Sequence, residues 1–225
     1  MNFYVEQKVL DVGVKILFAV IRGIDNTRNS EEWRAYRTER LAALLETYRD
    51  LDLKEDPILE GFNLLHDNSG VKRRKNIPAS ENLIKLLKKR EAMFYLNQAV
   101  DIYNLISLES KLALGAHDID HVEGNVTLRF TDGTERFQPI GQPEPIGINA
   151  GEYCYCDDAN EVLCRLEVRQ VEKTKVTEDA KNIFYIVQGN EATPEALLEE
   201  TAQAIIDTTV KYCGGEGEVI VPEVL

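Results

Sequence analysis

The order of apolar and polar residues divides the chain into a helical first half and a second half richer in strands. The short, β-branched apolar run at 12–22 predicts a buried strand, which Gly23 and the turn-forming residues after it close. In the segments that follow, apolar residues recur at helical spacing. Helices are therefore expected at 31–49, 56–66, 77–90 and 97–111.

Strand patterns begin after residue 120. Apolar and polar residues alternate over 126–130, which predicts a strand. The dipeptide Asp132-Gly133 then supplies a hairpin turn, and residues 137–140 are expected to return antiparallel. Further strands are expected at 152–156, 161–169 and 183–188.

A strong helix is expected near the C-terminus, with Thr193 as its cap, Pro194 in its first position and Gly214-Gly215 at its end. No repeat, low-complexity tract or linker rich in Pro, Gly and Ser divides the chain. We therefore expect a single domain over 1–225 of fold class α/β (α+β). Its helices are expected to pack on a mixed, mostly antiparallel sheet.

No segment matches a membrane span or an export signal. The longest apolar run, at 14–21, is interrupted by Lys15 and is far shorter than the about 20 residues that a spanning helix requires. The N-terminus carries Glu6 and lacks the basic and then apolar order of a signal peptide. We expect a cytoplasmic protein without a membrane partner.

Charge is distributed unevenly along the chain. The net charge of −13 argues against a protein that coats nucleic acid regardless of sequence, and DNA is not an expected partner. Residues 71–90 nevertheless hold eight basic side chains against Glu81, a local charge of +7, so the remainder carries −20. The basic residues include Lys72, Arg73, Arg74, Lys75, Lys88, Lys89 and Arg90. They are either a solvated helix end and its leading loop, or a phosphate-contacting surface that grips one end of an RNA.

Common catalytic signatures are missing. The sequence contains no phosphate loop, no GxGxxG, no HExxH and no GxSxG. His117 and His121 have a spacing that metal sites use, but a zinc site needs three or four ligands that converge, so no metal is expected. Cys154 and Cys156 alternate along an expected strand and are interpreted as small buried hydrophobic residues.

Three stretches together resemble a known family. They are LNQAVDIYNLISLESKLALGAHDID (96–120), GEYCYCDDANEVLCR (151–165) and VRQVEKTKVTEDAKN (168–182). They resemble the B3/B4 domain of the phenylalanyl-tRNA synthetase beta chain and, more closely, the free-standing proteins made of that domain alone. The resemblance covers about residues 10–213, and the other parts of a synthetase do not fit in this length.

The resemblance implies an α/β fold and a trans-editing hydrolase. Such a domain removes the wrong amino acid from mischarged tRNA, typically tyrosine from phenylalanine tRNA, without a metal or an organic cofactor. Its partner is the acceptor end of aminoacyl-tRNA. A synthetase needs such an editing pocket besides the pocket that first binds the amino acid, because one binding step cannot reject every near-isosteric amino acid.

The helix 97–111 carries part of the implied site. Asn97, Asp101 and Asn104 match the family's pattern Asn-x-x-Val-Asp-x-x-Asn. Asn104 is expected to be a catalytic amide that lines the pocket and holds the water or the terminal adenosine. Asn97 is a candidate substrate-binding residue, although helix capping is the favoured interpretation of Asn97 and Asp101. Tyr103 stands where many synthetase domains have threonine, and is expected to reshape the substrate pocket.

The turn expected after this helix departs from the family pattern. The family places a histidine where this chain has Gly115, and His117 lies two residues further on. Both are candidate catalytic residues, His117 as a displaced substitute and Gly115 through a backbone N–H offered to an oxyanion. The change puts the inherited specificity for tyrosine in question.

The second region supplies the remaining candidates. Arg169, Gln170 and Thr174 match the Arg-Gln-x-x-x-Thr run of the free-standing proteins, and Glu172 lies near the position of the family's pocket carboxylate. Gln170 and Glu172 are expected to be catalytic, and Arg169 and Thr174 to bind substrate. The alternative for Arg169 and Glu172 is an exposed ion pair at a strand end.

These candidates leave other function classes open. The histidine replacement motivates a non-catalytic domain that binds tRNA or an amino-acid-like ligand. A protein that kept the fold and lost the pocket is a third option. The sequence does not specify the amino acid, the tRNA or the oligomeric state.

Overall fold

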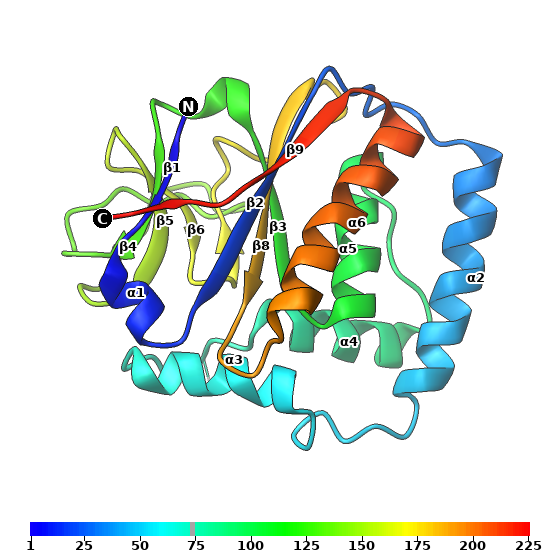
Figure 1. Cartoon of the computed structure of the whole chain (residues 1–225), viewed down its shortest axis with the longest axis horizontal. Coiled ribbons are helices and arrows are strands. Elements are labelled where there is room, and N and C mark those ends of the chain that lie inside the picture. The colour runs from blue at the N-terminus through cyan, green and yellow to red at the C-terminus, as the bar shows by residue number, and fades with distance from the viewer. Residues whose placement is uncertain (73–74) are drawn as a thin grey trace.

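The computed structural model describes residues 1–72 and 75–225, and these residues form three layers (Figure 1). Helices α5 (Gln98–Ser110) and α6 (Glu195–Cys213) cover one face of a four-stranded sheet, called here the smaller sheet. Its other face packs against a six-stranded sheet, the larger sheet. The expected α+β class is confirmed, with two sheets in place of one.

The smaller sheet is antiparallel throughout its described strands. Its order is β3 (Ala113–Asp118), β8 (Asn182–Gly189), β2 (Lys15–Arg22) and β9 (Glu216–Ile220). Strand β2 reads as a continuous apolar run because both of its faces are covered. Its residues Leu17, Ala19 and Ile21 face the helices, whereas Phe18 and Val20 face the larger sheet.

The larger sheet is mixed. Its order is β10 (Glu223–Val224), β1 (Phe3–Val5), β4 (Val126–Phe130), β5 (Tyr153–Asp157), β6 (Val162–Arg165) and β7 (Arg169–Gln170). Strand β1 runs parallel to β10 and β4, so the two termini of the described chain lie near each other (Figure 1). Cys154 and Cys156 are buried in this layer, as expected.

The other helices surround these layers. Helix α2 (Glu31–Tyr48) lies outside α5, while α3 (Pro57–Asn68) and α4 (Ala79–Arg90) run along one edge (Figure 1). Ser30 caps α2, and the Asp56 carboxylate accepts from two N–H groups at the start of α3. Helix α1 (Gln7–Asp11) and the 3₁₀ turn η2 (Ile119–His121) are short.

The predicted hairpin after β4 is wrong. Strand β4 pairs with β5, and residues 137–140 form no strand. The Glu135 carboxylate accepts from the N–H groups of Asp132 and Gly133, both at 3.0 Å, and pairs with Arg129. These bonds close a local turn, so the chain does not return along β4. It makes only isolated bridges to the far side of the sheet, from Arg136 to Glu161 and from Pro139 to Val171.

Two smaller expectations also differ from the structure. Pro194 is the N-cap of α6, and the Thr193 hydroxyl instead accepts from the Asn190 N–H at 3.0 Å. The strand expected at 161–169 is interrupted because Leu166 adopts a left-handed conformation with φ 54°. This turn separates β6 from β7.

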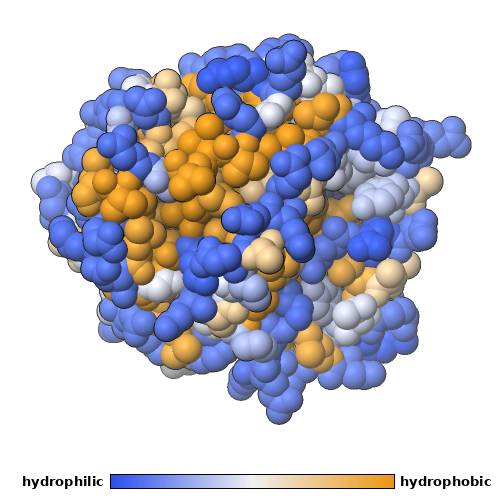
Figure 2. All heavy atoms as spheres, viewed as in Figure 1, coloured by the Kyte–Doolittle hydropathy of each residue, from blue (hydrophilic) through white to orange (hydrophobic). Residues whose placement is uncertain are grey.

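The surface carries apolar groups on one face. Figure 2 shows them over the region of β9 and the C-terminal segment, where Val221 is 76% and Leu225 62% exposed. No helix within the described residues is long and apolar enough to cross a bilayer.

Candidate functional site

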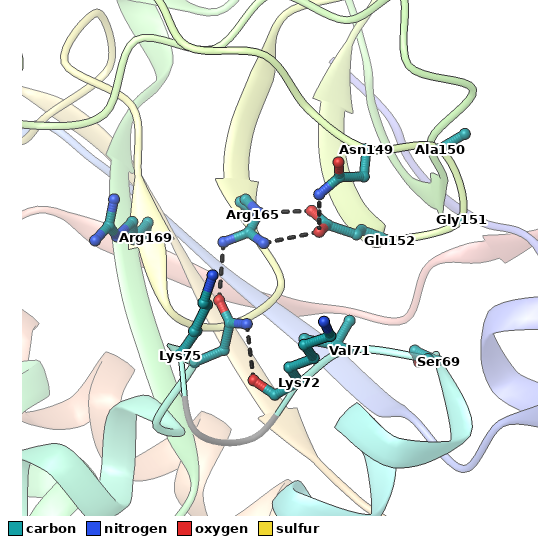
Figure 3. Close-up of a pocket in the computed structure, with 12 residues that line it drawn as sticks. Ser69, Val71, Lys72, Lys75, Asn149, Ala150, Gly151, Glu152, Arg165 and Arg169 are labelled. Atoms are coloured by element: carbon teal, nitrogen blue, oxygen red, sulfur yellow. Dashed lines mark hydrogen bonds and ion pairs between the residues drawn. The ribbon is translucent and has the colours of Figure 1, made fainter.

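Two hollows on the described part of the chain lie on either side of the turn between β6 and β7. The first, the amide pocket, has a volume of about 300 Å³. Its apolar lining includes Leu83, Leu86, Leu114 and Ile140. Its polar lining consists of Asn82, Tyr103, Asn104, Ser107, Glu167 and Gln170. The second, the cationic hollow, measures about 540 Å³ and is lined by Lys72, Lys75, Asn76, Glu152, Arg165 and Arg169 among others (Figure 3).

Helix α5 presents the polar groups of the amide pocket. Tyr103, Asn104 and Ser107 are three and four residues apart, so they share one face of the helix, and all three line the pocket. The half-buried Asn104 side chain makes no hydrogen bond to any described residue. Its amide therefore keeps both its donors and its acceptor available for a ligand.

Tyr103 and Gln170 meet in the same pocket from different layers. Burial raises the pKa of Tyr103 to about 12, although a hydrogen bond from the Gln170 amide acts in the opposite direction. The phenol therefore stays protonated at neutral pH. The ring packs edge-on against Tyr185 at 6.2 Å between centroids and leaves the pocket open.

The rest of the helix motif has structural roles. The Asn97 side chain caps α5 by accepting from the Val100 N–H at 3.1 Å, and its amide donates to the Val176 carbonyl at 2.9 Å. The capping interpretation is thus confirmed for Asn97. Asp101 does not cap the helix, because its buried carboxylate accepts from the Trp33 indole at 2.9 Å and pairs with Arg37 at 2.7 Å.

Gly115 lies inside β3 and not in a turn, which corrects the sequence interpretation. It stands immediately behind the amide pocket, because a Cβ built there would lie 2.5 Å from the Gln170 Nε2. The space that a side chain would occupy at this position is therefore held by the Gln170 amide. The glycine in β3 therefore leaves room for the Gln170 side chain of β7.

His117 and Thr174 lie in the core, outside both hollows. The His117 Nδ1 is 2.7 Å from the Thr174 hydroxyl, and the ring stacks on Phe184 with centroids 5.1 Å apart. Burial lowers the pKa of His117 to about 3, so the imidazole is neutral. Within the described residues its Nε2 has no hydrogen-bond partner.

Glu172 also lies outside the amide pocket. Its carboxylate pairs with Lys175 and accepts from the Gly141 N–H at 3.1 Å. The hydrogen bond from Lys175 lowers the pKa of Glu172 below its ordinary value. The ion pair expected as the alternative thus exists, but with Lys175 and not with Arg169. It anchors the turn that carries Ile140 to the pocket rim.

The cationic hollow joins residues expected in two different roles. Lys72 and Lys75 were predicted to contact tRNA and Arg169 to bind substrate, and all three line this hollow. Their side chains make no hydrogen bond or ion pair to any described residue. Arg165 instead holds Glu152 through two bonds of 2.5 and 2.8 Å (Figure 3).

The remaining basic residues of the cluster lie elsewhere. Lys88, Lys89 and Arg90 end α4, where Lys88 donates to the Leu51 carbonyl at 3.0 Å and Arg90 lies over the Phe94 ring at 4.5 Å. Helix α4 therefore divides the predicted cluster into two surfaces. Arg73 and Arg74, also predicted to contact tRNA, lie outside the described residues.

The sequence analysis missed a buried network that connects the two hollows, because Glu167 lines the amide pocket and Asn76 lines the cationic hollow. The His66 Nε2 is 2.7 Å from the Glu167 carboxylate, which also accepts from the Tyr153 phenol. The second nitrogen of His66 lies 3.1 Å from the Asn76 carbonyl. Burial acts against the charged imidazole, but the Glu167 carboxylate outweighs it and raises the pKa of His66. The only sequence signal was a histidine on an apolar helix face.

The two spaced histidines do not form a metal site. His117 is buried, whereas His121 is exposed and pairs with Asp118 at 3.2 Å. Within residues 1–72 and 75–225, no group of three or more His, Cys, Asp or Glu side chains gathers as metal ligands would.

The three layers and the two adjoining hollows define an α+β domain with a candidate ligand site beside the β6–β7 turn. A family model described as "B3/4 domain" matches residues 69–208, more than half of the chain. The chain therefore belongs to the B3/4 domain family.

Two similar proteins are beta subunits of phenylalanyl-tRNA synthetases, or fragments of them. The Fusobacterium nucleatum protein named phenylalanine–tRNA ligase beta subunit is 27% identical over 145 residues, which are 64% of this chain and 18% of that protein. The structure of an N-terminal fragment of the beta subunit from Pyrococcus horikoshii matches with a TM-score of 0.53 and 15% identity. That match covers all of this chain and 51% of the fragment, and it bears on the fold alone.

Proposed function

We propose that this chain is a trans-editing hydrolase that removes a wrong amino acid from mischarged tRNA, and that the ester binds in the amide pocket. The observation that carries the proposal is the unpaired amide of Asn104, which faces the same small pocket as the Tyr103 phenol and the Gln170 amide. The name of the Fusobacterium relative and the family match support a tRNA-related role.

Hydrolysis of the aminoacyl ester requires little from the protein beyond the positioning of the reacting groups. An aminoacyl ester is already activated, so hydrolysis needs a placed water and donors for the developing oxyanion. The N–H groups of Asn104 and Gln170 and the protonated Tyr103 phenol are such donors, and apolar side chains line the same pocket. Each oxyanion donor is worth about 2.7–4 kcal/mol in other hydrolases.

The partner in this proposal is the acceptor end of aminoacyl-tRNA. The net charge of −13 repels a polyanion from most of the surface, which favours contact through a limited basic area. A tRNA substrate is consistent with work in the cytoplasm.

A panel of aminoacyl-tRNAs tests the proposal. The protein is incubated with tRNA charged with labelled tyrosine, meta-tyrosine and other non-cognate amino acids, and release of the amino acid is measured. We expect at least one ester to be cleaved, and Asn104→Ala and Gln170→Ala each to lower the rate about 10²–10³-fold. Gln203→Ala, an exposed amide on α6, is the control with unchanged rate. Hydrolysis that survives both pocket variants would refute the site.

A second candidate is a non-catalytic domain that binds tRNA or an amino-acid-like ligand. It is favoured by the position of His117, which is buried and neutral outside the pocket, and by Gly115 at the family's histidine position. This alternative predicts that charged tRNA binds without turnover and that Asn104→Ala weakens the binding. Filter binding and hydrolysis measured on the same samples separate the two functions.

A further inference from the structure

The cationic hollow is built from segments that are far apart in the chain. Lys72 and Lys75 come from the loop between α3 and α4, whereas Arg169 comes from β7. All three side chains are exposed, and within the described residues none has a counterion. Three uncompensated cations around one hollow repel one another, and this arrangement is unfavourable unless an anion binds there.

The single carboxylate of this hollow does not oppose an anion. Glu152 accepts two bonds from Arg165, and Arg165 also donates to the Asn76 amide oxygen at 3.0 Å. Burial disfavours the ionised carboxylate, but Arg165 outweighs it and lowers the pKa of Glu152. The pair is therefore neutral and is held by several hydrogen bonds (Figure 3), and the hollow keeps the charge of its three free cations, +3 in a chain of −13.

The hollow and the amide pocket share their borders. Arg165 and Arg169 line the hollow. Their chain neighbours Val168, which lies between them, and Gln170, which follows Arg169, line the amide pocket. Along the other border, residues 75–76 line the hollow and Ile77 lines the pocket. An extended ligand with its terminal group in the amide pocket would have to pass over this common border to reach the hollow.

We infer that the cationic hollow binds backbone phosphate of a single RNA strand whose 3′ end enters the amide pocket, with Lys72, Lys75 and Arg169 as the phosphate ligands. The inference rests on the proposed function for the identity of the strand. Cationic side chains select phosphate oxygens over bases, so the contact fixes the position of the strand without reading its sequence. Arg169 adds a planar fork that fits two phosphate oxygens, whereas the two lysines act as point charges.

The expected salt dependence follows from the number of ligands. For a single strand the slope of log K against log salt is about −0.7 for each phosphate neutralised, so three contacts give about −2. Affinity for a short RNA is then expected to fall about 20-fold between 50 and 200 mM salt.

The test is fluorescence anisotropy with an uncharged single-stranded RNA that has the 3′-terminal sequence of a tRNA. The triple variant K72A/K75A/R169A is compared with K8A/K54A/K181A, which removes the same charge from exposed lysines outside the hollow. We expect the first variant to lose most of the affinity and the salt slope, and the second to keep both. None of the three hollow side chains bonds to another described residue, and circular dichroism checks that the variant stays folded.

The outcomes separate this inference from the proposed function. If the hollow variant binds RNA with the affinity and slope of the wild type, or if both triple variants lose equally, the phosphate site is wrong even where esters are cleaved. If RNA binding is lost only in the hollow variant while no ester is ever cleaved, the phosphate site stands and the hydrolase does not. Pyrophosphate that binds more tightly than the strand at the same salt would overturn the strand as the ligand in favour of a free phosphate compound.

Discussion

A substitution of Asp101 tests whether this residue of the family's helix pattern stabilises the fold, in contrast to Asn104, which lines the pocket. Its buried carboxylate joins α5 to α2 by accepting from the Trp33 indole at 2.9 Å and pairing with Arg37 at 2.7 Å. Burial raises the pKa of Asp101 above its ordinary value, although both partners act to lower it. Desolvation of the Asp101 carboxylate thus outweighs the effect of its partners on its pKa. Removal of this carboxylate leaves the donors of Trp33 and Arg37 without it in the interior.

The cost of Asp101→Ala can be worked from these contacts. Breaking a fully buried ion pair by removing one partner costs about 3–5 kcal/mol. Two features reduce this figure. Arg37 keeps 18% of its side-chain surface in water and donates to the Met93 carbonyl at 2.7 Å, and the Gln98 amide, turned to its hydrogen-bonding orientation, lies 3.0 Å from the indole nitrogen. We expect a loss of about 2–3 kcal/mol in the free energy of unfolding.

Urea unfolding measures this loss, with Glu109→Ala as the matched control. Glu109 pairs with Arg40 across the same two helices, but the two side chains are 24% and 45% exposed. An exposed pair of this kind contributes less than about 1 kcal/mol. The midpoint of Asp101→Ala should fall well below that of Glu109→Ala at an unchanged m-value. Equal losses in the two variants would show that burial of the acceptor does not decide the attachment of α2.

Two further predictions concern the pocket and its support. Gly115→Ala puts a Cβ 2.5 Å from the Gln170 Nε2, so the flexible amide must move, and the hydrolysis rate is expected to fall as it does in Gln170→Ala. The free energy of unfolding should change by less than about 1 kcal/mol, because alanine also removes the entropy cost of a glycine in a strand. Gly147→Ala, whose Cβ meets nothing within 4 Å, is the neutral control, and full activity of Gly115→Ala would contradict the coupling. For His66, the raised pKa means that its pair with Glu167 stabilises the fold fully below the unfolded pKa of about 6.5 and is lost as pH rises through the folded value. Urea titrations from pH 6 to above that value should show falling stability that His66→Gln removes, and an equal slope in the variant would exclude this pair as its source.

Much of the local structure was readable from the sequence because it depends on neighbours in the chain. The strand expected at 12–22 is β2 at Lys15–Arg22, and the helix expected at 31–49 is α2 at Glu31–Tyr48. Short-range apolar spacing and capping side chains decide such elements. The hairpin after β4 failed for the opposite reason. Strand β4 pairs with β5, which follows only after a long loop, and the local turn signal at Asp132-Gly133 does not reveal this long-range pairing.

The candidate site was readable in part. The resemblance identified Asn104 and Gln170, and the structure brings them to one pocket. It does not bring Glu172 there, because the nearby Lys175 holds that carboxylate at the surface. Gly115 lies behind the pocket and not in a turn. The family signal is a property of sequence positions, whereas convergence depends on which way each side chain points.

The sequence by itself determined the long helices and the central strands, the acidic balance with one basic segment, and the amide-bearing helix. Only the tertiary structure decided that the basic segment is divided by α4, that Lys72 and Lys75 meet Arg169 from a distant strand, and that His66 pairs with Glu167. The physical reason is the difference in the sequence range of the interactions. Helix and strand formation are set by interactions over a few residues, but a site is assembled by long-range packing that matches whole faces at once.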